Sequence, residues 1–438
     1  MQRWPQVKGL KSADAFRGRL EKLGSAMPFA DPPATDALAA PIEIAGRSAP
    51  NRLAILPMEG WDGTDDGRPT DLVRRRWGRF GSSGAGLVWG GEAFAVRPDG
   101  RANPHQLCRG PASAADLAEL RGLLAPSQVT GLQLTHSGRW ALEPRPGRPE
   151  PLLDRRRSGV GWSDAELDAL ADDYAASAVL ARDAGFDFVD VKACHGYLQH
   201  ELLGAEGSLE VRGRWLRTAI ERVRAAAPEI GIGVRLSVFD VVPHRAGADG
   251  VGEPEASMSE PFGFAAAEAP ALLAQLGVDL VCVTAGSPYY CPHVQRPAYF
   301  PPSDGYRPPE DPLVGVARLV GAAVELARAA PHATVVASGV SYLQEWLPHV
   351  ASAVVRDTPV ASVGIGRLAL SYHDAPADVL AGRPLDQRRL CRTFSDCTTA
   401  PRHGLVSGCW PLDDFYRDRP DRLELAAVKR RVRQVADV

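Results

Sequence analysis

The feature that most constrains the fold is an eightfold alternation of short apolar, β-branched runs with segments of helical periodicity. The runs that predict strands are 51–58, 84–93, 129–138, 186–196, 231–238, 278–286, 333–340 and 361–367. They are apolar throughout, as expected of parallel strands covered on both faces. Between the third and fourth runs, the segment 164–185 has apolar residues at helical spacing and Ser163 as a candidate N-cap. Eight such units predict an α/β fold, the (β/α)8 TIM barrel, with a doubly wound open sheet as the alternative.

The 438 residues exceed what one barrel needs. We expect an N-terminal extension over 1–45, the barrel over 46–384, and a C-terminal tail over 385–438 that packs on it. Two Gly/Pro-rich insertions, 241–264 and 287–312, follow the fifth and sixth predicted strands, and the second contains four tyrosines. Because barrels build active sites at the carboxyl ends of their strands, both are candidate lids, with solvated loops as the alternative.

Composition narrows the class of partner. The net charge of −3 offers no basic field for nucleic acid or an anionic membrane. No apolar run of about 18 residues predicts a membrane span. The first twenty residues lack the apolar core of a signal peptide, and seven cysteines are an odd number for a disulfide scaffold. These features predict a cytoplasmic enzyme with a small-molecule substrate, with homo-oligomerisation left open.

Reactive side chains crowd the end of the fourth predicted strand, in DVKACHGYLQH (190–200). Only five of the 50 basic residues are lysines, so Lys192 within a strand is a specific choice. A nucleophile–base pair of Cys194 and His195 is disfavoured, since adjacent strand residues point to opposite faces.

A metal site is a second reading of the strand ends. His136, His195, Glu59 and Glu92 could form a Zn²⁺ ring, as in a barrel hydrolase or lyase. However, the first strand has no HxH pair and no further histidine ends a later strand. We therefore predict no metal ligands and keep the metal-dependent enzyme as the weakest alternative.

The last two strands predict a phosphate site. ASGV (337–340) and GIGRLA (364–369) lie where barrels bind phosphate through backbone N–H groups, and Arg367 would add a charged contact. GIGRLA also matches a dinucleotide fingerprint, but no strand pattern follows it. We expect the phosphate of a bound cofactor there, with tight helix packing of the glycines as the alternative.

Six segments, in order, carry a resemblance to a known family. They are NRLAILPMEGWDGTDDGRPT, GAGLVWGGEAFAVRPDGR, LQLTHSGR, DFVDVKACHGYLQHELLG, GVRLS and SVGIGR. Over roughly residues 40 to 400 the chain resembles the old yellow enzyme family of NADH:flavin oxidoreductases. The resemblance implies FMN at the barrel mouth, NADH or NADPH as co-substrate, and hydride transfer through flavin N5 to an activated alkene. A desaturase or demethylase working in the oxidative direction is the alternative.

The resemblance also implies roles for individual residues. His195 and Lys192 would hydrogen-bond the substrate's oxygen, and Tyr197 would protonate its carbon. Gln133 would contact the pyrimidine edge of the flavin, and Arg235 would lie near N1 and C2=O. The residues implied in cofactor binding are Pro57, Met58, Glu59, Ala93, Gln133, Arg235, Gly339, Gly366 and Arg367.

Three departures from the family pattern bear on this reading. Lys192 replaces the usual histidine, which points to an anionic substrate or to a buried ion pair with Asp190. Glu59 replaces a threonine or cysteine near the flavin and leaves the redox tuning open.

The third departure concerns the tail. In the dienoyl-CoA reductase and trimethylamine dehydrogenase branch, four cysteines after the barrel bind an iron–sulfur cluster. Here only Cys391, Cys397 and Cys409 are present, with Phe394 at the second ligand position. We expect no cluster and no second nucleotide-binding domain, with electrons arriving directly from NAD(P)H.

Overall fold

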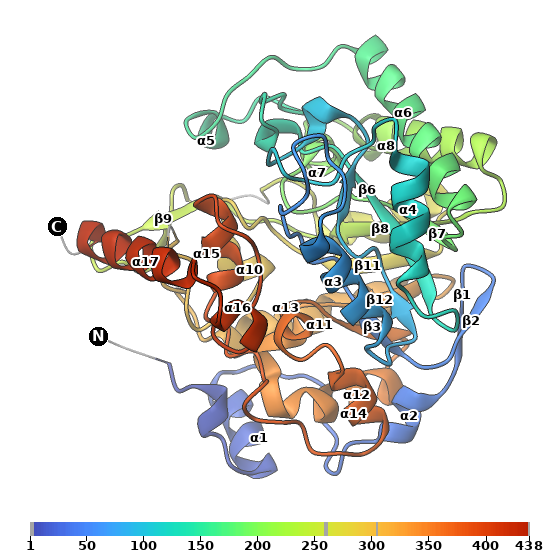
Figure 1. Cartoon of the computed structure of the whole chain (residues 1–438). Helices are drawn as coiled ribbons and strands as arrows, with labels where there is room; N and C mark the ends of the chain where they lie inside the picture. Colours follow the sequence, from blue (N-terminus) through green and yellow to red (C-terminus); the bar gives the residue numbers. More distant parts are fainter. Residues whose placement is uncertain (1–3, 258–261, 304, 437–438) are drawn as a thin grey trace.

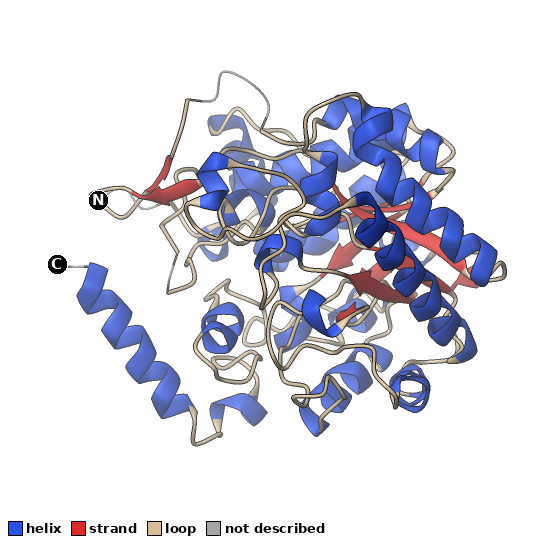
Figure 2. Cartoon of the chain, turned by 90° about the horizontal axis from the view of Figure 1, so that it is seen from above, coloured by secondary structure: helices blue, strands red, loops and turns tan. Residues whose placement is uncertain are grey.

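The strands of the computed structural model, which describes residues 4–257, 262–303 and 305–436, form a closed barrel (Figures 1 and 2). Each of the eight runs predicted from the sequence contains one strand of this barrel. The strands are β3 Leu53–Ile55, β4 Leu87–Val88, β6 Val129–Thr135, β7 Phe188–Val191, β8 Gly231–Ser237, β11 Leu280–Thr284, β12 Thr334–Ala337 and β13 Ser362–Ile365. Neighbours pair in parallel in chain order, and a short β5 (Ala93–Ala95) pairs with β6. The pairing of β13 with β3 closes the ring. The TIM barrel is confirmed, and the open-sheet alternative is wrong because it would leave two strand edges unpaired.

Helices cover the outside of the barrel, and Figure 2 shows them around the strands. The main ones are α3 Asp71–Gly81, α4 Ser113–Gly122, α6 Asp164–Asp183, α8 Leu209–Ala226, α9 Ala269–Leu276, α11 Pro312–Ala329 and α12 Leu347–Asp357, followed by the short α13 Arg367–Ser371 and α14 Ala375–Leu380. The predicted helix with Ser163 as N-cap is α6, where Ser163 and Glu166 form a capping box.

Strand residues alternate between two apolar layers. Those facing the helices belong to one large cluster, whereas Ala54, Leu87, Trp89, Phe188 and Cys282 fill the barrel interior. The antiparallel hairpin of β1 (Ile42–Ile44) and β2 (Arg47–Ala49) contributes to the interior cluster through its own buried residues. Because the hairpin lies against Gly231 at the start of β8, it closes the amino end and leaves the carboxyl end for a site.

The segment before this hairpin contains η1 (Val7–Gly9), α1 (Ala13–Lys22) and α2 (Thr35–Ala39). Phe16 of α1 packs on Trp346, with ring centroids 5.2 Å apart, and Arg19 forms an ion pair with Asp311. The predicted division of the chain after residues 45 and 384 stays a prediction.

Short elements complete the connections after the strands. They are η2 Pro98–Gly100, η3 Gly138–Trp140, α5 Pro151–Asp154, α7 Leu198–Leu203, β9 His244–Ala246, β10 Gly252–Pro254, η4 Ala266–Glu268, α10 Pro292–Gln295 and η5 Val340–Trp346. The first insertion, 241–264, contains the β9–β10 hairpin, and four of its residues, 258–261, lie outside the described ones. The second insertion contains α10.

The C-terminal segment continues through α15 (Asp396–Arg402), α16 (Asp414–Arg417) and α17 (Arg422–Ala436). It packs against the second insertion: Arg296 donates a hydrogen bond to Thr398, and Tyr299 N–H donates to Thr393 Oγ1 over 3.0 Å. In Figure 1, α15 lies beside α10. Two segments about a hundred residues apart therefore meet at the carboxyl end of the barrel.

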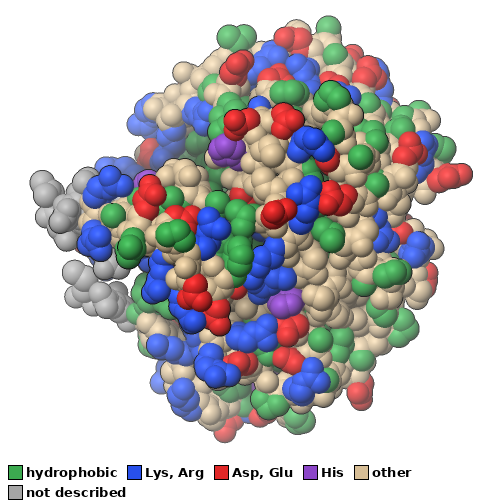
Figure 3. All heavy atoms as spheres, in the orientation of Figure 1, with side chains coloured by type: hydrophobic (Ala, Val, Ile, Leu, Met, Phe, Trp, Pro, Cys, Tyr) green, Lys and Arg blue, Asp and Glu red, His purple; other side chains and the backbone are tan. Residues whose placement is uncertain are grey.

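The face of the molecule in Figure 3 carries no field of one sign. On the face in Figure 3, acidic and basic side chains are interspersed. Among the described residues, no helix is both long enough and apolar enough to cross a bilayer.

Candidate active site

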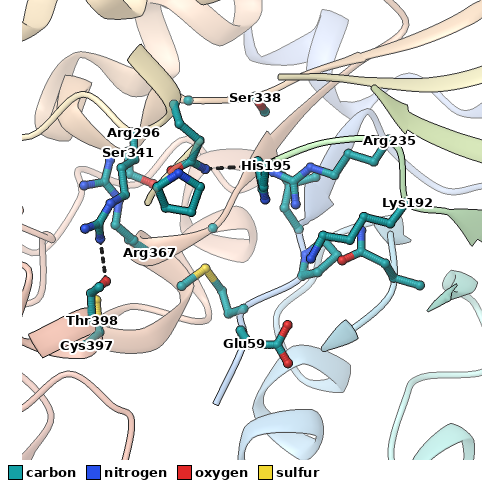
Figure 4. A pocket seen from close by; sticks show the side chains of 18 of the residues that line it. Glu59, Lys192, His195, Arg235, Arg296, Ser338, Ser341, Arg367, Cys397 and Thr398 are labelled. Carbon is teal, nitrogen blue, oxygen red and sulfur yellow. Dashed lines mark hydrogen bonds between the residues drawn. The ribbon is translucent and has the colours of Figure 1, made fainter. Parts of the chain in front are cut away.

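A cavity of about 1160 Å³, open to solvent, lies at the carboxyl ends of the strands. Its lining includes these residues expected from the sequence: Pro57, Met58, Glu59, Gln133, Lys192, His195, Tyr197, Arg235, Gly339, Gly366 and Arg367. Ala93 is not among them; it is fully buried in β5. Figure 4 shows Lys192 and Arg235 at one end and Arg296, Ser341 and Arg367 at the other. The cavity thus has basic groups at both ends.

Arg235 is a buried cation whose side chain forms no ion pair with the described residues. Its position on β8 is fixed by the backbone, because its N–H donates to Asp190 Oδ1 over 2.6 Å. Within the described part of the chain, its guanidinium forms no ion pair, and its Nε is buried without a hydrogen-bond partner. Since an unpaired buried charge is costly, a bound anion suits this end of the cavity.

Asp190 organises the side of the cavity beneath Gln133. Its Oδ2 accepts from Gln133 Nε2 over 2.6 Å and from Trp89 Nε1 over 2.7 Å. Burial raises the pKa of Asp190 to about 6, against the effect of these hydrogen bonds. The Gln133 amide oxygen is the group left for a ligand. Asp190 forms no ion pair with Lys192 in the described structure, so the buried ion pair considered as one explanation of Lys192 is not present.

Lys192 follows the last residue of β7, and its Nζ lies 4.1 Å from the centroid of the Tyr197 ring. Burial lowers the pKa of Lys192, and the nearby Glu59 carboxyl opposes this. The carboxyl is affected in the opposite sense: burial raises the pKa of Glu59 to about 8, against the Lys192 charge. Glu59 therefore mainly carries its proton at neutral pH.

His195 adopts a left-handed backbone conformation, with φ of 66°. Its Nε2 lies 3.1 Å from Gln295 Nε2 and 3.4 Å from Thr284 Oγ1. Burial and the charges of Arg235 and Lys192 hold the pKa of His195 well below its usual value. The ring is therefore neutral, and in this orientation of the Gln295 amide, whose nitrogen faces Nε2, the ring proton lies on Nδ1.

Tyr197 is 3% exposed, and its hydroxyl lies 3.0 Å from that of Tyr289. Burial raises its pKa well above the usual value, and the Tyr289 and Glu59 groups raise it further. The hydroxyl is therefore protonated and can act as an acid. Cys194, which lies between Lys192 and His195 in the sequence, does not line the cavity. Its side chain is fully buried, and burial raises the pKa of its thiol to about 12.

The other end of the cavity suits a phosphate. Gly339 has φ of 86°, which favours glycine, and an added Cβ there would lie 2.4 Å from Leu319 Cδ1. At Gly366, a Cβ would lie 3.1 Å from Met58 Sδ. Arg367 Nη2 donates to Pro297 O over 2.8 Å, whereas its buried Nη1 has no partner among the described residues. This end of the cavity therefore has both features considered from the sequence: tight packing at Gly339 and, on Arg367, an N–H donor available to a phosphate.

The residues considered for a metal ring do not converge. Of the four, only Glu59 and His195 line the cavity. Glu92 accepts instead from Gly60 N and Arg76 Nη1, over 2.8 and 2.7 Å. The described residues hold no group of three His, Cys, Asp or Glu side chains placed to bind a metal ion.

Part of the lining was not expected from the sequence. It comprises Leu56, Trp61, Pro288, Tyr289, Gln295, Arg296, Ser338, Ser341, Cys397, Thr398, Pro401 and Arg402. The tyrosines of the second insertion were a signal for Tyr289, and the ASGV segment was one for Ser338. The C-terminal residues carried no comparable signal.

The three tail cysteines lie near one another. Burial raises the pKa of Cys397 and Cys409, and the neighbouring thiols raise both further. Cys397 lines the cavity, whereas Cys391 is buried. The expectation that they bind no iron–sulfur cluster stays a prediction.

The structure is thus a closed (β/α)8 barrel with a cavity at its carboxyl end that has basic groups at both ends. The chain belongs to the NADH:flavin oxidoreductase / NADH oxidase family, whose model matches residues 37–260. This confirms the family inferred from the strand-end motifs.

Individual relatives are more distant. The chain is 30% identical over 255 residues to a NADH:flavin oxidoreductase of Gibberella zeae, covering 49% of this chain and 61% of that protein. It is 29% identical over 204 residues to a NADPH dehydrogenase of Bacillus subtilis, covering 42% and 59%. The chain therefore spans less than two thirds of these relatives. In fold it is similar to a 2-naphthoyl-CoA reductase complex, with a TM-score of 0.69 at 17% identity, covering 90% of this chain and 58% of that one.

Proposed function

We propose that the protein binds FMN in this cavity and transfers hydride from NADH or NADPH to an activated alkene, such as an α,β-unsaturated carbonyl compound. The observation that carries the proposal is that Lys192, His195 and Tyr197, from one loop after β7, line the same cavity as Arg235 and Arg367. Each of these two arginines has a buried N–H donor without a partner among the described residues. Family membership supports the cofactor and the co-substrate.

The cavity residues fit FMN. Arg235 would face the part of the ring that becomes negative on reduction, with the Gln133 amide oxygen available for the ring's N–H groups. Gly339, Gly366 and Arg367 would hold the phosphate, and Pro57 and Met58 would pack against the ring. When bound, FMN supplies a carrier that accepts hydride from the nicotinamide and passes it to the second substrate.

The loop after β7 would act on the substrate. The His195 Nδ1–H and the Lys192 ammonium can donate to the carbonyl oxygen, where negative charge develops during reduction. Tyr197 would protonate the α-carbon, because its hydroxyl retains its proton. A protonated hydroxyl at this position favours reduction of the substrate over desaturation or demethylation, because those reactions would need a base there.

The test measures flavin reduction and flavin reoxidation separately in the variant Tyr197→Phe. Under anaerobic conditions, we expect reduction of the bound flavin by NAD(P)H at the wild-type rate and reoxidation by an unsaturated ketone slowed by about 10² or more. Equal loss of both half-reactions would contradict the role of Tyr197. A purified protein without visible flavin absorption, but with tightly held Zn²⁺, would favour the metal-dependent alternative.

A further inference from the structure

We propose that Tyr289, on the second insertion, returns the proton that Tyr197 gives to the substrate. Its hydroxyl would donate to the Tyr197 oxygen as that oxygen becomes negative, and it would then take a replacement proton from water. Tyr289 would thus act through Tyr197, as a positioning residue in a proton relay. The inference rests on the proposed role of Tyr197 as the acid.

The geometry joins one enclosed tyrosine to a more accessible one. The oxygens are 3.0 Å apart, within hydrogen-bond distance. Tyr197 is 3% exposed, whereas Tyr289 is half-buried. A replacement proton for Tyr197 therefore has an inward route through Tyr289.

Tyr289 is also held in place. Its ring stacks on Trp140, with centroids 4.2 Å apart and an interplanar angle of 6°. Its backbone N–H donates to Ser287 Oγ over 3.2 Å, and Ser287 Oγ donates in turn to the backbone oxygen of His195 over 2.9 Å. The insertion that carries Tyr289 is thereby tied to the loop that carries Tyr197.

The surrounding charges favour proton transfer from Tyr289 to Tyr197. Burial raises the pKa of both phenols, and Glu59 adds to this at both, but the hydrogen bond with Tyr197 and the Arg402 and Arg157 guanidinium groups lower the pKa of Tyr289. Around Tyr197 lie the Lys192 ammonium, the Glu59 carboxyl and the Ser137 hydroxyl. The Tyr197 pKa is raised further by Glu59 and Tyr289. Negative charge is thus better tolerated on Tyr289, which makes it the better final donor of the pair.

The step balances with water as the proton source. The substrate's double bond gains a hydride, which originates from NAD(P)H, and a proton from Tyr197. The Tyr197 O–H bond breaks as the new C–H bond forms. The Tyr289 O–H bond then breaks as the Tyr197 O–H bond re-forms, and water restores the proton to Tyr289. Per turnover, one proton leaves the solvent and both tyrosines end unchanged.

The test uses the FMN-loaded full chain, reduced anaerobically and mixed with cyclohexenone. We expect Tyr289→Phe to slow reoxidation by about tenfold, because a hydrogen bond to a developing charge is lost. Flavin reduction by NAD(P)H, FMN affinity and the unfolding midpoint should match wild type. Tyr306→Phe is the control: it removes another buried hydroxyl of the insertion, bonded to His293 over 2.8 Å.

A double-mutant cycle shows whether Tyr289 acts through Tyr197. In the Tyr197→Phe background, Tyr289→Phe should cause no further loss. A similar loss in both backgrounds would mean that Tyr289 only shapes the cavity, and wild-type reoxidation in the single variant would also overturn the relay. If Tyr197→Phe itself reoxidises at the wild-type rate, the proposed function fails at Tyr197, which is a different result.

Discussion

The cavity has two halves of different origin. One half comes from the ends of barrel strands and includes Arg235 and His195. The other comes from the second insertion and the C-terminal segment and includes Tyr289, Gln295 and Thr398. The strand half offers the charged and acidic groups of the proposed chemistry, whereas the added half contacts those groups from outside, at Tyr197 and His195. The barrel thus supplies reactive groups, and the added segments orient them and connect them to water.

The largest expected effect lies in the strand half. Arg235→Met removes the buried cation whose Nε has no partner among the described residues. We expect the reduction potential of bound FMN to fall and its reduction by NAD(P)H to slow by about 10², because the reduced, anionic ring loses its counter-charge. Potentiometric titration and stopped-flow spectroscopy measure the two quantities.

Two further variants sharpen this comparison. Arg235→Lys keeps a charge and should recover part of the potential. Arg296→Met, from the added half, should weaken FMN affinity and leave the potential near that of wild type, because Arg296 lies with Arg367 at the opposite end (Figure 4). An unchanged potential in Arg235→Met would contradict the assignment of the two ends.

The same division explains what the sequence could predict. The strands and their carboxyl ends follow from periodicity, because a parallel strand fixes the end at which its residues emerge, whereas the roles of Arg235 and Tyr197 were implied by the family resemblance. Ala93 was assigned to the cavity but is buried, since two short strands share the second run and its backbone pairs with Gln133 instead. Thr398 and Arg402 could not be predicted, because their approach depends on tertiary contacts between segments without periodicity.

A smaller effect is expected at Gln295 in the added half. Gln295→Leu removes the donor to His195 Nε2, which leaves Thr284 as its remaining contact. The ring proton is then no longer fixed on Nδ1, so kcat/KM for cyclohexenone should fall about fivefold, the effect of one neutral hydrogen bond. Flavin reduction should be unchanged.

The background variant for this prediction is His195→Ala, in which Gln295→Leu should have no further effect. Loss of FMN from Gln295→Leu, or an equal loss of kcat/KM in the two backgrounds, would show that Gln295 supports the cavity as a whole and not His195.

The smallest effect on catalysis is expected at Asp240, which anchors the insertion to the barrel. Its carboxylate oxygens accept from the Tyr290 hydroxyl and, over 3.4 Å, from Cys291 Sγ. Burial raises the pKa of Asp240 to about 7. Between the ordinary carboxyl pKa and this value, the folded chain holds a proton that the unfolded chain has lost, so this residue's contribution to stability falls as pH rises.

Asp240→Asn should remove that dependence. We expect the wild type to lose about 3 kcal/mol of unfolding free energy relative to the variant between about pH 4.5 and 7.5. Urea denaturation at several pH values measures the difference, with the exposed Asp249→Asn as control. Parallel pH curves for wild type and Asp240→Asn would mean that Asp240 is ionised across this range. The insertion would then be held by a charged acceptor at every pH tested.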